Sequence, residues 1–451
     1  MDHDARIMFC IVLIMALANT TLLVPPTLAS YEVVSYDPNG SSHWTKKSHL
    51  WSSLDMRLDR AGYVFLAESN LDYSCPIRQF SKNGSGRREW LLDVGCTQVV
   101  ALDDGFAIGV WRPEADGEGA DSYHYTYSVS SFDFDGLQLW TYSCDEIGEP
   151  CSIAVDPKGQ YLAVGSYELA WLDSSGQLLH ATAYHDCGDI SQRNLQFEPN
   201  GVLVVAGCHD DATSVQWFDA SGSLLQTAEF PRVDLDDQSD RAQLVLDRNE
   251  SALVANRCAV DQGCLGKFDS NGNRLWLKRF PYDPDGWHSL ALAVGPAGQT
   301  VVGVNNRYYA EIITYDTDGK KLWTTRIDNV EDVPNNNVYD IKVDRDGNTY
   351  VVAELCDRAT HDGDCKTGYL RFVTIKYGPS GNVVWTAERG TEASLEDTEP
   401  YSAGSVYVMY EWLSSRLLLS PELAFSSDDD TSDDDDQSSS DDDSDSAGCG
   451  C

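Results

Sequence analysis

The chain has 451 residues, of which 42% are hydrophobic and 23% are charged, so it is long enough to bury a large core. Its 32 Lys and Arg stand against 72 Asp and Glu, which gives a formal net charge of −40 at pH 7. Such an acidic surface repels phosphate backbones, and this excludes nucleic acid as a partner class.

Residues 1–30 have the pattern of an export signal. An apolar run at 7–17 is extended at 22–24 and followed by small residues at 27–30. Two aspartates near the start make its first residues atypical, so an uncleaved membrane anchor is the alternative. No later segment is long and apolar enough to span a bilayer, so we expect no transmembrane helix in the mature chain. The predicted location is the cell envelope, the cell surface or the extracellular space.

From residue 31 onward one phrase returns at intervals near fifty residues: an apolar residue, Asp, two variable residues, Gly, and Trp four residues later. Asp and Gly at these offsets favour tight turns between strands, so each copy predicts a β-hairpin. The complete copies end at Trp44, Trp140, Trp276 and Trp323, and a copy with Gly378 in place of Asp ends at Trp385. Weaker copies reach His180 and Gln226, and one at Phe80–Gly84 reaches Trp90 with two extra residues.

A second hairpin, with the same Asp-x-x-Gly turn but an apolar run after it, alternates with the first. Its copies centre on Gly62, Gly105, Gly159, Gly201, Gly298 and Gly347, and Glu250 replaces the glycine in one more. The last copy, around Gly404, is poor, and the strand at 406–412 could pair with 416–419 instead.

Two hairpins per repeat give four strands, which is one blade of a β-propeller. We therefore predict an all-β propeller of eight four-stranded blades, or seven if the terminal pair forms no blade. The chain opens with one hairpin type and ends with the other. The N- and C-terminal strands should therefore share one blade and close the ring, which removes exposed sheet edges.

The segments 344–352 and 376–385 carry the closest version of both phrases, and they resemble the bacterial β-propeller repeat of exported proteins. The Trp spacing is also similar to the tryptophan-docking repeat of eight-bladed quinoprotein propellers. The resemblance covers residues 31 to about 412 and implies the architecture. It implies no single function, because both groups include catalytic and purely structural members.

Cysteine usage agrees with export. Without Cys10 of the signal, twelve cysteines remain, and ten of them form close pairs that predict disulfides in an oxidising compartment. The pairs are Cys75 with Cys96, Cys144 with Cys151, Cys187 with Cys208, Cys258 with Cys264, and Cys356 with Cys365. In a propeller all ten lie in or beside the loops of one face, which we call the loop face. Each bridge is worth about 2–4 kcal/mol.

The loop face is also acidic, and it carries the candidate metal ligands. His185-Asp186-Cys187 and Cys208-His209-Asp210-Asp211 could converge there, and two thiolates with two imidazoles would bind Zn²⁺. In an exported protein the thiols are expected to form a disulfide, which leaves His185, His209, Asp210 and Asp211 as weak candidates. Asp316/Asp318 and Asp344/Asp346 are similar to calcium loops but lack the full ligand set, so we read them as hairpin turns. No cofactor is predicted, and Ca²⁺ or Zn²⁺ is the alternative.

The tryptophans of the repeat occupy one fixed position, which predicts packing between blades. Trp111 and Trp287 lie in or beside loops of the acidic face and are the candidates for ligand contact, together with His185 and His209.

The last residues, 426–451, form an acidic tail. Residues 426–446 contain eleven aspartates and no apolar side chain, so they should be disordered, and the chain ends Gly448-Cys449-Gly450-Cys451. This end resembles the C-terminal tags of myxobacterial surface proteins, which implies surface attachment. A solubilising tail is the alternative. The predicted domains are a signal peptide at 1–30, the propeller at 31–425 and the tail.

These observations predict an exported, non-enzymatic β-propeller that binds or scaffolds an unknown protein or glycan. The alternative is a quinoprotein-like or metal-dependent enzyme that uses the same acidic face. Such an enzyme would need a cofactor pocket on the ring axis, and the chain lacks the adjacent cysteines that many quinoproteins carry.

Overall fold

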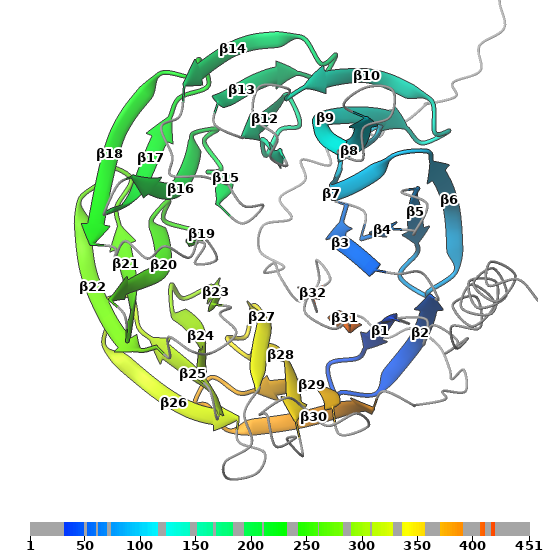
Figure 1. Cartoon of the computed structure of the whole chain (residues 1–451). Helices are drawn as coiled ribbons and strands as arrows, with labels where there is room; N and C mark the ends of the chain where they lie inside the picture. The colour runs from blue at the N-terminus through cyan, green and yellow to red at the C-terminus, as the bar shows by residue number, and fades with distance from the viewer. Residues whose placement is uncertain are drawn as a thin grey trace, which may run out of the picture.

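A computed structural model describes most of the chain between residues 31 and 419. The described ranges are 31–48, 52–59, 62–69, 74–115, 123–144, 151–165, 168–183, 194–209, 212–231, 242–259, 261–282, 290–306, 309–327, 336–356, 370–390, 406–410 and 416–419. Within them every regular element is a β-strand, and no helix there could cross a membrane. Eight antiparallel four-stranded sheets surround one axis (Figure 1). The eight-bladed propeller is confirmed, and the seven-bladed alternative is wrong.

Seven blades have their strands in chain order from the axis outward. Blade 1 contains β3 (Ser52–Leu58), β4 (Val64–Ser69), β5 (Cys75–Phe80) and β6 (Gly86–Leu92). Blade 2 contains β7 (Gly95–Ala101), β8 (Gly105–Ala115), β9 (Tyr123–Asp133) and β10 (Gln138–Ser143). Blade 3 contains β11 (Ser152–Val155), β12 (Tyr161–Gly165), β13 (Glu168–Asp173) and β14 (Leu178–Ala183). Blade 4 contains β15 (Leu195–Phe197), β16 (Leu203–His209), β17 (Ala212–Phe218) and β18 (Leu224–Pro231).

The other three blades of this kind follow the same order. Blade 5 contains β19 (Gln243–Leu246), β20 (Ala252–Ala259), β21 (Gln262–Phe268) and β22 (Arg274–Pro281). Blade 6 contains β23 (Leu290–Val294), β24 (Thr300–Asn306), β25 (Tyr309–Tyr315) and β26 (Lys321–Ile327). Blade 7 contains β27 (Asn337–Val343), β28 (Thr349–Cys356), β29 (Leu370–Tyr377) and β30 (Val383–Gly390).

The eighth, closing blade joins the two ends of the propeller, as predicted. Its outer strands are β2 (Ser42–Ser48) and β1 (Tyr31–Tyr36), and its inner strands are β31 (Val406–Tyr410) and β32 (Arg416–Leu419). The inner pair is reversed, because β31 pairs with β1 and the later strand β32 lies nearest the axis. The expected hairpin around Gly404 is therefore not the turn between these strands. The alternative pairing of 406–410 with 416–419 is confirmed.

The Asp-x-x-Gly phrase builds its turn through the aspartate side chain. In blade 6, Asp316 Oδ1 accepts the backbone N–H groups of Asp318 (3.0 Å) and Lys320 (2.7 Å), and Gly319 N–H donates to Asp316 O (3.0 Å). Gly319 has a φ of 75°, which an L-residue adopts only with strain. Glu250 takes this place with a φ of 59°, and among the described residues it is the one non-glycine with a positive φ.

The repeated tryptophans join neighbouring blades, which confirms the packing role predicted for them. Each ring covers the turn glycine of the following blade, as Trp323 covers Gly381 and Trp385 covers Gly40 across the ring closure. The indole nitrogen also donates to the carbonyl of the second turn residue of that blade. These bonds run from Trp44 to Lys82 (3.0 Å), Trp140 to Ser174 (3.1 Å), Trp276 to Thr317 (2.9 Å), Trp323 to Pro379 (3.0 Å) and Trp385 to Pro38 (2.9 Å).

The weaker copies of the phrase keep the same arrangement. His180 covers Gly222, and Gln226 lies over Gly272 and donates its amide to Ser270 O. Every blade therefore contacts the next one at this position, whichever side chain it uses. We call the carbonyl of the second turn residue the docking carbonyl, and the face that carries these turns the turn face.

Candidate functional site

Disulfides are present on the loop face. Three predicted bridges are confirmed: Cys75–Cys96, Cys144–Cys151 and Cys258–Cys264. Cys356 is also disulfide-bonded, and its predicted partner Cys365 lies outside the described residues. The fifth predicted bridge is not tested, because Cys187 and the side chain of Cys208 lie outside them.

Most of the predicted ligand residues of this face also lie outside the described part of the chain. They are His185, Asp210, Asp211 and Trp287, while His209 ends β16 with an undescribed side chain. The zinc hypothesis therefore stays a prediction. Within the described ranges, no group of three His, Cys, Asp or Glu side chains is placed to hold a metal ion.

The two calcium-like phrases are turns. Asp344 Oδ1 accepts the N–H groups of Asp346 (3.0 Å) and Asn348 (2.8 Å), as in the turn at Asp316. Its other oxygen accepts Asn348 Nδ2 (2.8 Å) and the Tyr350 hydroxyl (3.1 Å). The carboxylate is thus engaged by its own hairpin, which confirms the turn interpretation.

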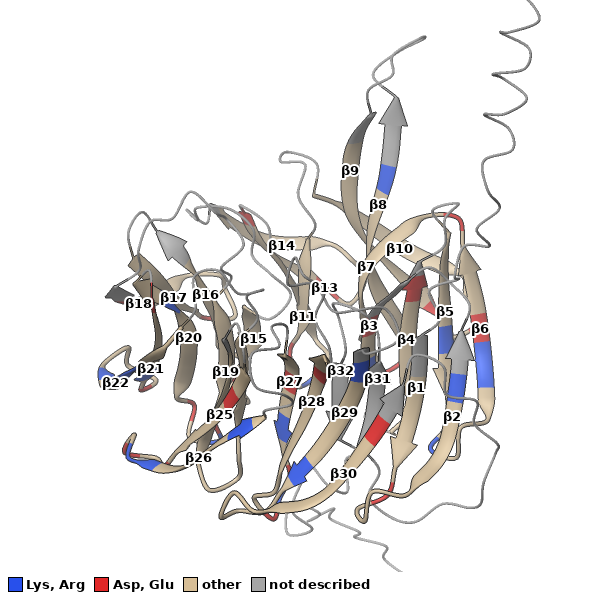
Figure 2. Cartoon of the chain, turned by 60° about the horizontal axis from the view of Figure 1, so that its bottom comes forward, with Lys and Arg blue, Asp and Glu red and all other residues tan. Residues whose placement is uncertain are grey.

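Trp111 lies on the longest hairpin of the described structure. Strands β8 and β9 have eleven residues each, and Figure 2 shows them rising beyond the other strands as an arm. The Trp111 indole packs against Gly95, where a Cβ would overlap it. The Trp111 ring also meets the ring of Tyr125 edge-on at 5.4 Å, and Tyr125 is 45% exposed. Trp111 is therefore partly structural, and Tyr125 is the more accessible aromatic. The alternating tyrosines at 123, 125 and 127 are the feature of the sequence from which an exposed aromatic side chain on this strand could have been predicted.

A second surface was missed by the sequence interpretation, at the junction of blades 1 and 2 on the turn face. The two extra residues before Trp90 are borne out by the strand pairing, in which β5 and β6 pair Phe80 with Gly86 and Gln79 with Arg88. The closing blade pairs Tyr36 with Ser42 and Ser35 with Trp44 in the same way. Arg88 thus occupies the docking position of blade 1. Trp90 lies two residues further along β6 and covers Gly136 from there.

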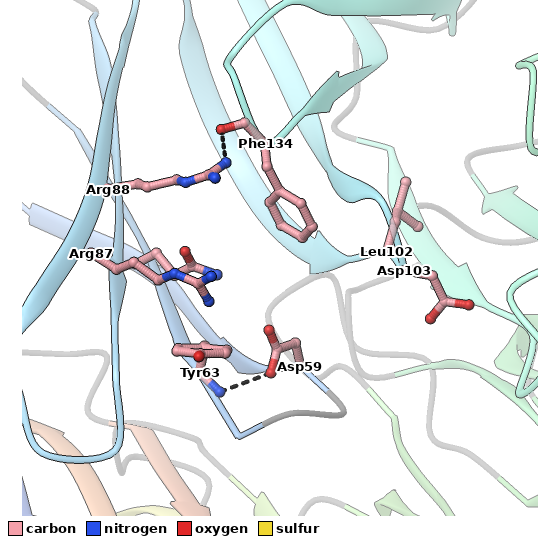
Figure 3. A pocket seen from close by; sticks show the side chains of 8 residues that line it. Asp59, Tyr63, Arg87, Arg88, Leu102, Asp103 and Phe134 are labelled. Carbon is pink, nitrogen blue, oxygen red and sulfur yellow. Dashed lines mark hydrogen bonds between the residues drawn. The ribbon is translucent and has the colours of Figure 1, made fainter.

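Arg88 performs the docking that tryptophan performs elsewhere. Its Nη1 donates to the docking carbonyl of Phe134, and its guanidinium lies 5.5 Å from the centre of the Phe134 ring. Arg87, at the bulge of the same strand, lies over the Tyr63 ring at 4.4 Å (Figure 3). Cation–π contacts of this kind contribute about 0.5–1 kcal/mol at exposed sites.

These side chains surround a pocket of about 250 Å³ (Figure 3). It is bounded by β6, by the inner turns of blades 1 and 2, and by the outer turn of blade 2. Its lining residues are Asp59, Tyr63, Gln79, Arg87, Arg88, Leu102, Asp103 and Phe134. The pocket therefore combines two guanidinium groups, two carboxylates and apolar surface from aromatic rings and leucine.

Two of the buried carboxyl groups in the core have strongly raised pKa values. Burial raises the pKa of Glu68 to about 8, although its ion pair with Arg78 (2.8 Å) opposes the shift. Burial likewise raises the pKa of Glu354 to about 7, and the Tyr339 hydroxyl donates to its Oε2 at 2.8 Å. Tyr339 belongs to the cluster that packs blade 7 against Val34 and Tyr36 of the closing blade, so Glu354 lies beside the ring closure.

No protein-family model and no curated protein sequence matches the chain. Among solved structures, BamB from Moraxella catarrhalis is 13% identical, with a TM-score of 0.48 over 78% of this chain and 92% of that one. The Dos1 propeller is 14% identical, with a TM-score of 0.43 over 70% and 78% of the two chains. A protein from Lactobacillus plantarum, also 14% identical, has a TM-score of 0.43 over 66% and 96%. Since these scores lie below 0.5, the fold assignment rests on the strand pairing described above.

Proposed function

We propose that this protein is an exported, non-enzymatic β-propeller that binds a protein or glycan at the cell envelope or outside the cell. The signal-like residues 1–30 and three bridges between described cysteines support export, because structural disulfides persist in oxidising compartments. The likeness of its repeats to those of exported bacterial propellers supports it as well. In this proposal the tail at 426–451 follows the propeller and attaches it to a surface.

The observation that carries the binding role is the arm of β8 and β9. Backbone pairing runs along its whole length, from Gly105 with Asp133 to Ala115 with Tyr123. The hairpin therefore presents its aromatic side chains on a stiff support. Tyr125 is held edge-on against Trp111, which is itself fixed on Gly95. An exposed aromatic ring that is already ordered by its neighbour loses little entropy on binding, and aromatic side chains form the energetic centre of many interfaces.

The test is a binding comparison between the wild type and Tyr125→Ala, using glycan arrays and immobilised envelope proteins. We expect at least about a tenfold loss of affinity for the ligand that the wild type binds, with an unchanged melting temperature. Leu139→Ala is the matched control, because Leu139 is 48% exposed on β10 of the same blade. Equal binding by the wild type and Tyr125→Ala would contradict the role of the arm. Turnover that depends on Ca²⁺ and pyrroloquinoline quinone, or on another metal, would favour the enzyme alternative.

A further inference from the structure

One junction of the ring departs from the other seven in the charge at two positions of its outer strand. The bulge and docking positions of the other blades carry no Lys or Arg. Their residue pairs are His43-Trp44, Leu139-Trp140, Leu179-His180, Leu225-Gln226, Leu275-Trp276, Leu322-Trp323 and Val384-Trp385. Blade 1 has Arg87 and Arg88 at these two positions. The pocket lies at this junction, where a slender guanidinium stands in the place that a bulky indole fills in five of the other seven blades.

Docking alone does not require these charges. In blade 4 the uncharged Gln226 donates to the equivalent docking carbonyl, and Leu225 occupies the bulge. Within the described ranges, Arg88 forms one ion pair, with Asp135 Oδ1 at 3.9 Å, and Asp135 is almost fully exposed. An exposed pair of this length contributes little to stability. The positive charge of the two arginines is thus not required for docking.

Arg87 and Arg88 are available to a ligand. Arg87 is exposed, and its guanidinium lies over the face of the Tyr63 ring. A guanidinium held over a ring can still donate its N–H groups to the two oxygens of a carboxylate. Arg88 donates from Nη1, so further N–H groups remain on the same guanidinium.

We propose that the pocket between blades 1 and 2 binds a carboxylate carried on an apolar or aromatic stem. The carboxylate lies against the guanidinium groups of β6. The stem lies against the Phe134 ring and Leu102, which line the same pocket. Asp59 and Asp103 stand on the inner turns, so they repel an anion from that side and set the direction in which the ligand enters. A volume of about 250 Å³ has room for one substituted ring.

The test uses benzoate as the probe, with its affinity measured by ligand-observed NMR titration of the whole protein. Benzamide is the neutral probe of the same shape, and inorganic phosphate is the anion without a stem. We expect benzoate to bind at least about tenfold more tightly than either, and to weaken as salt is added. Benzamide or phosphate binding as tightly as benzoate would overturn the proposal.

The variant Arg87→Leu/Arg88→Gln copies the pair at 225 and 226, so it should dock and melt as the wild type does. We expect it to lose benzoate binding by at least about tenfold. Arg87→Gln alone changes an exposed side chain, and this variant should lose a large part of the affinity for benzoate. Arg326→Gln is the matched control, because Arg326 lies over the Tyr309 ring at 3.9 Å on another outer strand. Unchanged benzoate binding in the Arg87 and Arg88 variants, or an equal loss in Arg326→Gln, would overturn the proposal.

Discussion

The junction between blades 6 and 7 and the junction between blades 1 and 2 have the same backbone geometry but different fillings. In the first, the Trp323 ring covers Gly381 and its nitrogen reaches Pro379 O at 3.0 Å. In the second, Arg88 reaches the equivalent carbonyl of Phe134, and a pocket remains beside it. Both junctions share a donor for the docking carbonyl. At the junction of blades 1 and 2, the guanidinium at the docking position leaves a pocket beside that contact.

The largest effect should come from removing a sealing tryptophan. Trp276 is buried, covers Gly319 and donates to Thr317 O, so Trp276→Ala should lower the free energy of unfolding by about 3–5 kcal/mol. Arg88→Ala loses chiefly one hydrogen bond at the hollow junction and should cost about 1 kcal/mol. Urea unfolding of both variants measures the difference. Equal losses would show that the two kinds of junction contribute alike.

The glycine under the ring provides a second comparison. Gly381 has a φ of 83°, and a Cβ there would lie 2.7 Å from Trp323 Cδ2. Gly201 has a φ of 90° with no atom within 4 Å of its Cβ position. Gly201→Ala should therefore cost the backbone strain alone, about 1 kcal/mol. Gly381→Ala adds steric overlap and should cost about 2–4 kcal/mol in the same unfolding experiment. Equal costs would mean that the ring moves aside freely.

The junction between blade 7 and the closing blade should make the free energy of unfolding depend on pH, although its docking residue is the usual tryptophan. Because burial raises the pKa of Glu354 to about 7, the folded protein holds a proton that the unfolded chain releases near pH 4.5. The stability from this group is complete below about pH 4.5 and is lost as the pH rises through about 7.

Glu354→Gln should therefore match the wild type at pH 4 and exceed it by on the order of 2–3 kcal/mol at pH 8. Glutamine can still accept the Tyr339 hydroxyl, so the substitution removes the charge and little else. Denaturant unfolding across this pH range measures the effect. A stability difference that does not change with pH would contradict it.

The smallest effect should come from the turn with a glutamate in the glycine position. Glu250 has a φ of 59°, so Glu250→Gly should relieve strain and raise the free energy of unfolding by about 1 kcal/mol. Alanine still has a Cβ, so Glu250→Ala keeps the backbone strain at positive φ and should bring no comparable gain in the free energy of unfolding. A gain of the same size in both variants would place the cause in the lost charge and not in the backbone.

The fold could be predicted from the sequence because each residue type in the turn phrase has one structural role. Asp and Gly appear where the side-chain cap and the positive φ are needed, and Trp appears where the blades meet. The reversed order of β31 and β32 could not be read, since the residues around Gly404 carry no clear turn phrase. The hydrogen bonds of the Gln98 side chain with both backbone groups of Ile153 in the next blade (2.9 and 3.0 Å) could not be predicted either, because Gln98 belongs to no repeated phrase.

The candidate sites were harder to predict than the fold. The sequence placed Trp111 near the loop face but could not show that Gly95 and Tyr125 hold it. The pocket was missed because the repeats were aligned on their tryptophans. In blade 1 this alignment selects Trp90, which lies two residues beyond the docking position. Register along the strand, and not the residue type, assigns Arg88 to the docking position. A departure from the repeat was thus the signal for this site.

The reversed inner pair of the closing blade determines on which side of the ring the last described strand ends. Val406 pairs with Tyr36 and with Leu419, and Tyr36 directly precedes a turn of the turn face. The chain therefore leaves the last strand on that side, whereas Tyr31 begins on the side of the arm. The chain thus leaves the described propeller on the side of the Arg87 and Arg88 pocket. The arm of β8 and β9 rises from the opposite side, so the two sides of the ring offer different surfaces to a ligand.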